Sequence, residues 1–560
     1  MARSSPLLQV DNLSLGFQLE GGLKPLLKSI CLAVLPGQTL ALVGESGSGK
    51  SMTALAIMQL LPSIARAHVD SRIVFKQQEL LGLSQRGMRK IRGRQIGMVF
   101  QNAMSAFNPV LTIGYQLHEV LSCHFALSRA AERERILELL DEVGIVNPLQ
   151  CYRAYPHQLS GGMRQRALIA MALAAEPELL IADEPTTALD VTIQAQVLAT
   201  LQSIQAKRRM SMLFISHDLG VVARMADTVA VLYHGEIVEQ ASASDFFHHP
   251  QEAYSKQLFA SLPAMKANLP NPERCLSMET PLLTVDNLSV HFPLHTGFLG
   301  YGRDSVKAVD GVSFNLYSGK TLALIGESGS GKTTIGRAIL QLIPSTSGQI
   351  YFTDQLLGDL NRRDLKNLRK DIQVIFQDPY AALNPRMTIA SILEEGMLVQ
   401  GIGKTAAERL RRMDDLLVAV GLNPDCKQRY PHEFSGGERQ RICIARALTV
   451  EPKLLICDEP TSALDVSVQA QILKLLRQLQ EERGLAYLLI THNFGVVSYL
   501  ADEVAVMYRG QIVEHGTSQQ ILSAPQHPYT QKLLASVLTA EFSEKLIPKT
   551  TVASDEVVTD

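Results

Sequence analysis

The sequence predicts an α/β fold with mainly parallel sheets, built twice along the 560-residue chain. Short aliphatic runs alternate with longer segments of helical periodicity. TLALVG, ELLIADE and SMLFISHD in the first half correspond to TLALIG, KLLICDE and AYLLITHN in the second. Continuous apolar strands separated by helices are typical of a parallel sheet that is covered on both faces. The chain length itself predicts roughly two to four domains.

Two matched segments indicate a tandem duplication. LQVDNLSLGF (8–17) returns as LTVDNLSVHF (283–292), and VLYHGEIVE (231–239) returns as VMYRGQIVE (506–514), each displaced by 275 residues. A period this long excludes a solenoid, whose units are about 20–50 residues. We expect a first domain at 1–262, a proline-containing linker at 263–281, a second domain at 282–540 and a frayed tail at 541–560.

Composition excludes several classes of protein. Lys and Arg (53) nearly balance Asp and Glu (55), so the formal charge of −2 does not indicate a nucleic-acid binder. We find neither a secretory signal nor 18 uninterrupted apolar residues, so another chain is expected to cross any membrane at which this protein works. The seven cysteines form no C-x-x-C pair, which favours reduced thiols in a cytosolic protein.

A glycine-rich loop follows an expected strand and precedes an expected helix in each half. We call GESGSGKS (44–51) and GESGSGKT (326–333) the phosphate loops. Their backbone N–H groups and helix N-termini suit phosphate, and Lys50 or Lys332 adds a point charge. The residues expected to bind nucleotide here are Gly44, Ser46, Gly47, Gly49, Lys50, Ser51, Met52, Gly326, Ser328, Gly329, Gly331, Lys332, Thr333 and Thr334.

Two adjacent carboxylates end a later strand in each half, in LLIADEPTTALD (179–190) and LLICDEPTSALD (454–465). An isolated pair of this kind is usually a solvated strand end. Downstream of a phosphate loop, Asp183 and Asp458 are instead expected to hold a magnesium shell with the loop hydroxyls.

Further motifs resemble the ATP-binding-cassette family over nearly the whole chain, twice. LSGGMRQR (159–166) and FSGGERQR (434–441) are similar to its signature motif, VFQN and IFQD to its Q-loop, and FISHD and LITHN to its switch region. The resemblance implies two nucleotide-binding domains, each with a RecA-like core, an antiparallel β part and a helical subdomain, about 103–175 and 378–450. It implies the catalytic residues Glu184, His217, Gln101, Glu459, His492 and Gln377, and the magnesium ligands Ser51, Gln101, Asp183, Thr333, Gln377 and Asp458.

The resemblance also implies that the two halves pair head to tail within one chain. The signature of one half would close on the γ-phosphate held by the other, because a Ser-Gly-Gly helix start is a second anion site. These residues are Ser160, Gly161, Gly162, Ser435, Gly436 and Gly437. Asp190 and Asp465 would couple the sites. Tethering makes the meeting intramolecular, at an effective concentration on the order of millimolar. We expect both sites to hydrolyse ATP, with Met163 opposite Glu438 and Asp218 opposite Asn493 as mild asymmetries.

Some residues have competing interpretations. Phe17 and Phe292, at matched positions, resemble the aromatic residues that stack on adenine, although an aromatic at a strand end is often core packing; Tyr301 is an alternative in the second half. His157 and His432 precede the signature, and positioning of that loop is the preferred interpretation because the carboxylates already supply a base.

Other segments resemble the oligopeptide and dipeptide importer branch of the family, including its fused microcin C and peptide importers. These are FQNAMSAFNP (100–109) and FQDPYAALNP (376–385), where a membrane subunit would dock, and the His-Pro-Tyr elements in 248–258 and 526–537. We interpret the first copy as carrying an inserted Gln-Glu-Ala before Tyr254. The resemblance implies an ATP- and Mg²⁺-dependent ATPase that drives peptide import.

The resemblance further implies two non-identical membrane permease subunits, a separate substrate-binding protein and a place on the cytoplasmic face of the plasma membrane. Many unfused members of this branch have a cysteine cluster, similar to an iron–sulfur site, just after the His-Pro-Tyr element. Here that stretch contains only Cys275, so no iron–sulfur cluster is expected. The alternatives are a soluble tandem ATPase acting on ribosomes or DNA, an exporter, and an importer of nickel, glutathione or opines. The basic segment RGMRKIRGR (86–94) is best interpreted as a solvated helix face, and no nucleic acid is expected as partner.

Overall fold

A computed structural model describes residues 5–19, 22–101, 106–186, 189–260, 280–293, 305–462 and 464–537. Most of the expected linker, the expected tail, Tyr301 and Cys275 lie outside these ranges.

A six-stranded sheet forms the centre of each half. The buried strand β3 (Thr39–Val43) pairs in parallel with β9 (Ser211–Ser216) and β10 (Thr228–Tyr233), and the outer strand β11 (Glu236–Ser242) is antiparallel. The order β11-β10-β3-β9-β8-β7 matches β21-β20-β14-β19-β18-β17 in the second half. The other strands are β7 (Ile96–Val99), β8 (Leu179–Asp183), β14 (Thr321–Ile325), β17 (Ile372–Ile375), β18 (Leu454–Asp458), β19 (Ala486–Ile490), β20 (Glu503–Tyr508) and β21 (Gln511–Thr517).

An antiparallel sheet packs beside each central sheet, with a helix between them. Buried Val10 of the antiparallel sheet, Ile57 of the helix and Leu40 of β3 belong to one core cluster. The helices between the sheets are α1 (Lys50–Ile57) and α12 (Lys332–Ile339). The strands are β1 (Leu8–Leu19), β2 (Gly22–Val34), β4 (Ala65–Ala67), β5 (Arg72–Phe75), β6 (Gln78–Glu79), β12 (Leu283–Pro293), β13 (Ser305–Leu316), β15 (Ser347–Phe352) and β16 (Gln355–Leu356).

A helical subdomain lies beside each sheet. Its helices begin at side-chain caps such as Thr112, Ser128 and Thr388, which satisfy free N–H groups. They are α4 (Ile113–His124), α5 (Arg129–Glu142), α6 (Pro148–Arg153) and α7 (Gly161–Leu173), then α14 (Pro379–Ala382), α15 (Ile389–Gln400), α16 (Ala406–Ala419) and α17 (Gly436–Leu448).

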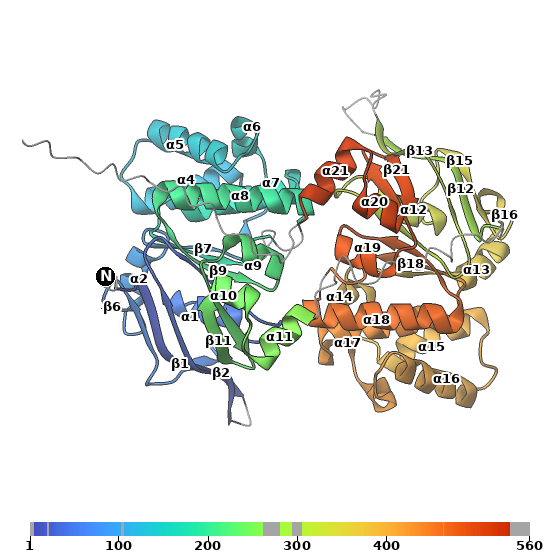
Figure 1. The fold of residues 1–560 in the computed structure, drawn as a ribbon, viewed down its shortest axis with the longest axis horizontal. Helices are drawn as coiled ribbons and strands as arrows, with labels where there is room; N and C mark the ends of the chain where they lie inside the picture. The colour runs from blue at the N-terminus through green and yellow to red at the C-terminus, as the bar shows by residue number, and fades with distance from the viewer. Residues whose placement is uncertain are drawn as a thin grey trace, which may run out of the picture.

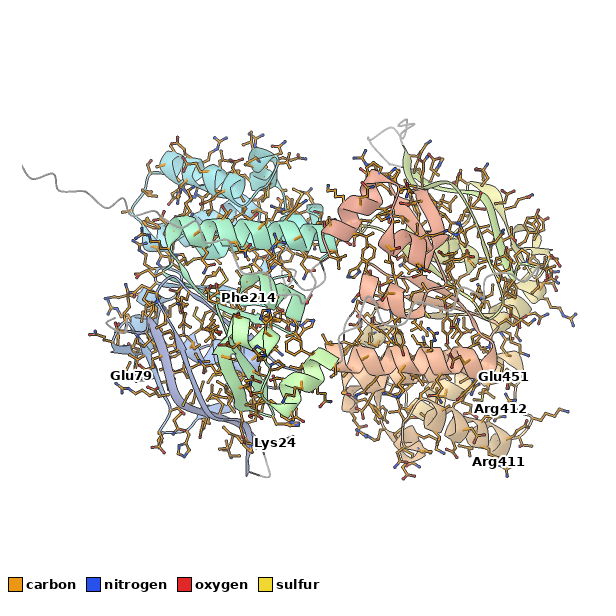
Figure 2. All side chains as sticks on the ribbon, viewed as in Figure 1. Lys24, Glu79, Phe214, Arg411, Arg412 and Glu451 are labelled. Atoms are coloured by element: carbon orange, nitrogen blue, oxygen red, sulfur yellow. The ribbon has the colours of Figure 1, made fainter. Side chains whose placement is uncertain are left out.

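The remaining helices lie around the sheets, and some of them face the opposite half. In Figure 1, α11 lies near α18, and α21 lies near α8. Figure 2 labels Phe214 in the buried centre of the first half, and Arg412 with Glu451, an ion pair of 3.1 Å on the outer side of the second. No described helix is both long and apolar enough to span a bilayer. These helices are α2 (Gln85–Ile91), α8 (Val191–Arg208), α9 (Leu219–Met225), α10 (Ala243–His248), α11 (Ala253–Ala260), α13 (Arg362–Asp371), α18 (Val466–Arg483), α19 (Phe494–Leu500), α20 (Ser518–Ser523) and α21 (Pro528–Ala535).

A buried charged cluster distinguishes the first helical subdomain from the second. His118 Nδ1 lies 2.8 Å from Glu132 Oε2, and His118 Nε2 lies 2.7 Å from the Tyr152 hydroxyl. His118 and Glu132 are both almost fully buried. On α15 and α16 the corresponding pair is Glu394 with Arg409, at 2.8 Å and more exposed.

Replacing His118 by Ala is expected to reduce the free energy of unfolding by about 1–3 kcal/mol, because Glu132 stays buried and loses a partner. Bonds from Ser122 and His118 hold the pKa of Glu132 below its ordinary value of 4.5. The stabilisation is therefore complete above pH 4.5 and is lost as the pH falls through the lower folded-state pKa. Urea unfolding across this pH range measures both effects. Glu394→Ala is the control, with an expected loss below about 1 kcal/mol; equal losses would contradict the argument.

Candidate active sites

The two phosphate loops have the backbone that phosphate binding requires. Gly49 and Gly331 are the N-caps of α1 and α12, with φ of 110° and 107°, a conformation that residues with a side chain disfavour. A Cβ on Gly44 would lie 2.1 Å from the carbonyl oxygen of Leu232. The glycines therefore let the loop close tightly, so that the N–H groups at the start of the following helix can face an anion.

The loop lysines are held inside the loops. Lys50 Nζ donates to the carbonyl oxygens of Gly44 (2.7 Å) and Glu45 (2.8 Å), and Lys332 makes the matching bonds at 2.7 and 2.9 Å. Both lysines are 5% exposed. Burial lowers the pKa of each, and nearby carboxylates oppose this shift. A bound phosphate would add the negative charge that such a buried cation favours.

Two of the three predicted magnesium ligands of each half meet beside its phosphate loop. The Ser51 hydroxyl donates to Asp183 Oδ1 at 3.1 Å, and the Thr333 hydroxyl donates to Asp458 Oδ1 at 3.2 Å. Burial raises the pKa of Asp183 to about 6, and the charge of Glu184 adds to the rise. A dication would reverse that shift. Hydroxyl and carboxylate oxygens, completed by phosphate and water, are a donor set that fits Mg²⁺.

Glutamine and histidine converge on the second carboxylate of each site. Gln101 Nε2 donates to Glu184 Oε2 at 2.7 Å, and His217 Nδ1 lies 3.0 Å from Glu184 Oε1. In the second half the Gln377 and His492 distances to Glu459 are 2.7 and 2.9 Å. The predicted catalytic residues are thus brought together in both halves.

Both glutamates also have an unusual backbone. The φ angles of Glu184 and Glu459 are 46° and 48°, in the left-handed region that residues with a side chain rarely adopt. Their amides donate to Ile215 and Ile490 on the neighbouring strand, which holds this conformation in place. Other matched pairs, such as Glu176 and Glu451, share a positive φ, so the backbone fixes the direction of the two glutamates without by itself marking a functional site.

Burial and hydrogen bonding have opposite effects on the pKa values of each glutamate and its histidine. Burial raises the pKa of Glu459, but the bond and charge of His492 outweigh it, so the net pKa is below 4.5. Burial lowers the pKa of His492, but Glu459 raises it further, and the net pKa is above 6.5. The pKa of His217 is likewise raised by Glu184 against the effect of burial. The contact thus favours the protonated histidine and the ionised carboxylate, and an ionised carboxylate is the form that can accept a proton from water.

The halves meet at the segments that follow these glutamates. Asp190 Oδ1 accepts hydrogen bonds from the backbone N and hydroxyl of Ser328 in the opposite phosphate loop, both at 2.8 Å. The Asp190 charge also acts to raise the pKa of Lys332 and His492, and Asp465 acts in the same way on the first half. The lysine and histidine of each site thus interact electrostatically with a carboxylate of the other half.

A second pair of contacts crosses the same interface. The Thr192 hydroxyl donates to Glu327 Oε1 at 2.7 Å, and the Ser467 hydroxyl donates to Glu45 Oε1 at 2.5 Å. Sequence reasoning missed all four residues. The repeat offered a signal, because a hydroxyl follows Asp190 and Asp465 by two positions in both halves and a glutamate opens both loops after the first glycine.

Comparison with known families matches the family described as ABC transporter over residues 27–187 and 309–462. The chain belongs to the ABC transporter family. A second family, described as the oligopeptide/dipeptide transporter C-terminal region, matches 238–283 and 513–556. The resemblance predicted from the sequence is thereby confirmed, and the chain is an ABC ATPase that binds ATP. The two central sheets, whose strands are mainly parallel, confirm the predicted α/β fold.

Its relatives cover nearly the whole chain. The peptidoglycan transport ATP-binding protein YejF of Agrobacterium fabrum is 46% identical over 97% of this chain and 98% of its own length. The glutathione import ATP-binding protein GsiA of Pectobacterium atrosepticum is 45% identical over 96% and 90%. Among solved structures, the ATP-binding cassette MJ0796 bound to ADP and Pi is 27% identical, with a TM-score of 0.38 over 42% of this chain and 98% of its own.

The two signature helices of this ABC ATPase differ at their starts. Ser160 accepts a hydrogen bond from the amide of Met163 and caps α7. Ser435 caps α17 in the same way, and its own hydroxyl donates to Glu438 at 2.8 Å. Glu438, which stands opposite Met163 in the repeat, thus restrains the serine hydroxyl in the second signature only. Both helices begin with two glycines, Gly161 and Gly162 or Gly436 and Gly437.

The other predicted site residues lie outside this constellation. Phe17 is half-buried and Phe292 is 44% exposed, each near the end of the first strand of its half, so stacking on adenine stays a prediction. His157 and His432 stack on the tyrosines two residues before them, with ring centroids 5.7 Å apart in both halves. This packing is consistent with a role in positioning the loop before the signature.

The interpretation of the first His-Pro-Tyr element was wrong in one respect. Tyr254 occupies the same place as Tyr529, because each hydroxyl accepts a hydrogen bond from the second residue of its own phosphate loop. The two tyrosines lie 275 positions apart in the sequence, and so do the first residues of α11 and α21. Glu252 and Ala253 therefore replace His and Pro in the first copy, with no inserted residue.

Proposed function

We propose that this chain is the ATP-hydrolysing subunit that powers import of peptides or peptide-like compounds through a separate pair of membrane permease subunits. The observation that carries the proposal is the match of both halves to the C-terminal region of oligopeptide/dipeptide transporters. Relatives that cover nearly the whole chain are named for peptidoglycan transport and glutathione import, which supports a peptide-like substrate.

In the proposed reaction, each phosphate loop binds the β- and γ-phosphates through its amides and lysine. A magnesium ion held by Ser51 and Asp183, or by Thr333 and Asp458, would neutralise phosphate charge. Glu184 or Glu459 orients a water and accepts its proton on a carboxylate oxygen as the water oxygen attacks the γ-phosphorus. The bond between the γ-phosphorus and the bridging oxygen breaks, and ADP leaves with that electron pair.

The opposite half completes each site in this proposal. The Ser160 and Ser435 helix starts would offer amides to the γ-phosphate held by the other half. The cross-half bonds of Asp190, Thr192 and Ser467 support this head-to-tail arrangement, because they bring the segment after one half's glutamate against the other half's phosphate loop.

We further propose that the two permease subunits are not identical. The segment after Gln377 is fastened to the signature helix α17: Arg439 lies 3.9 Å from the centre of the exposed Tyr380 ring, and Arg446 donates to the Ala382 carbonyl at 2.6 Å. The first half has Met104 and Met171 in place of Tyr380 and Arg446. A different docking segment on each half favours a different subunit on each. The chain would then work at the cytoplasmic face of the membrane, with a separate substrate-binding protein.

Reconstitution tests the proposed function. The chain would be assembled in vesicles with its permease subunits and binding protein, and ATP turnover measured with a di- or oligopeptide, glutathione, nickel or an opine. Stimulation by peptide or glutathione is expected. Stimulation by nickel or opine alone, or purification with a single permease in two copies, would contradict the corresponding proposal.

Tyr380→Ala is expected to reduce this substrate-stimulated turnover by about 2- to 10-fold while unstimulated turnover changes little, because the variant loses the cation–π contact with Arg439. Met104→Ala at the matched position is the control. Equal reductions by the two variants would contradict a distinct linkage in the second half.

A further inference from the structure

The C-terminal elements of the two halves, around α11 and α21, are built in the same way. In the first half, Glu239 of β11 accepts hydrogen bonds from the amides of Gln251 (2.9 Å) and Glu252 (3.2 Å), just before α11. Glu514 of β21 binds the corresponding amides before α21, at 2.7 and 3.1 Å. The carboxylate thus fastens the start of the helix to the sheet, as a helix cap does.

The anchored helix delivers a tyrosine to the phosphate loop. The Tyr254 hydroxyl accepts from the Glu45 amide at 3.2 Å, and the Tyr529 hydroxyl accepts from the Glu327 amide at 3.1 Å. Both tyrosines are nearly buried. Their rings pack on Tyr233 and Tyr508, with centroids 4.0 and 4.2 Å apart. The hydroxyl therefore has little freedom to leave the loop.

Burial keeps the hydroxyl in its neutral form. It raises the pKa of Tyr254, and it raises the pKa of Tyr529 to about 12. A neutral hydroxyl accepts the amide hydrogen without placing negative charge beside the phosphates. This suits a group that has to support an anion site from behind.

The glutamate that binds the tyrosine through its amide also binds the opposite half through its side chain. Glu45 Oε1 accepts from Ser467 at the start of α18, and Glu327 Oε1 accepts from Thr192 at the start of α8. The proximity of α11 to α18, and of α21 to α8, is visible in Figure 1. One loop residue thus connects the C-terminal element of its own half to the other half.

We propose that Tyr254 and Tyr529 are positioning residues for ATP binding, which hold the first turn of each phosphate loop in place and connect the C-terminal element to the interface between the halves. The loops need such support because several of their glycines adopt positive φ and the free loop has many alternative conformations. This inference deepens the proposed function and rests on it for the identity of the reaction.

The test uses the full chain with one phosphate loop inactivated. In a Lys332→Met background the first loop alone binds nucleotide, so Tyr254→Phe is expected to weaken ATP binding and raise KM by about 2- to 10-fold, with kcat less affected. Tyr529→Phe should change neither value in that background, and a Lys50→Met background should reverse the two results. Tyr233→Phe is the matched control, because it removes a hydroxyl from the stacked ring.

A second variant keeps the proposal testable if Tyr254→Phe folds poorly. Ser467→Ala removes the bond to Glu45 from the opposite half and is expected to raise KM for ATP in the Lys332→Met background; its effect should be less than additive with that of Tyr254→Phe. Unchanged KM in both variants, or equal effects of Tyr254→Phe and Tyr529→Phe in one background, would overturn the inference. Nucleotide binding is measured without permease, so these outcomes are independent of the transport assay that tests the proposed function.

Discussion

Replacing Glu184 and Glu459 together by Gln is expected to lower ATP turnover by at least about 10²-fold, because a general base contributes 10²- to 10⁴-fold to such reactions. The amide keeps the shape of the carboxylate but has no pair of electrons with comparable basicity. Nucleotide binding should persist, since the phosphate loops and their lysines are unchanged. Steady-state phosphate release and equilibrium binding of ATP separate the two effects.

The single variants test whether both sites hydrolyse ATP. Each site has the same Glu, Gln and His at nearly equal distances, and Asp190 connects the first half to the opposite phosphate loop. We therefore expect Glu184→Gln and Glu459→Gln each to leave less than half of the turnover. Glu134→Gln, at an exposed position of α5, is the control for the same exchange of Glu for Gln outside the two sites. Wild-type turnover in either single variant would contradict the assignment of that glutamate as the base.

Much of the fold was predictable because its signals are local. A continuous apolar strand that ends in a glycine-rich loop, as at Thr39–Val43 and Thr321–Ile325, requires only neighbouring residues to be interpreted. Because the chain is a tandem repeat, each of these patterns occurs twice, and each copy supports the interpretation of the other. The motif residues from Lys50 to His492 could be proposed as site residues for the same reason.

Contacts between distant segments were not predictable from these patterns. Tyr254 lies 209 residues from Glu45, and Ser467 lies 422 residues from it. A tyrosine or serine in a helix has many ordinary uses, and only the folded chain shows which hydroxyl reaches the loop. The apparent insertion before Tyr254 had the same origin. His249 and Pro250 suggested that Gln-Glu-Ala had been inserted, whereas the bonds of Glu239, which match those of Glu514, show that the backbone is equivalent.

Two double variants are expected to give opposite results if each nucleotide is bound between the halves. Lys50→Met removes the loop cation of one site, and Ser435→Arg should block the signature that completes that same site. Together they leave the site of Lys332 and Ser160 intact, so the variant should still bind one ATP. Lys50→Met with Ser160→Arg damages both sites, and binding should fall by at least about 10-fold at each, the usual loss for a charge-assisted contact.

The contrast between these variants depends only on which half supplies the signature. The two proteins carry the same kinds of substitution, so differences in folding or charge largely cancel. If each half enclosed its own nucleotide, Lys50→Met with Ser160→Arg would keep one site and Lys50→Met with Ser435→Arg would lose both. Counting bound nucleotide per chain by equilibrium dialysis distinguishes the two patterns. The bonds from Asp190 to Ser328 and from Ser467 to Glu45 favour the first, because they bring each half's catalytic strand end against the other half's phosphate loop.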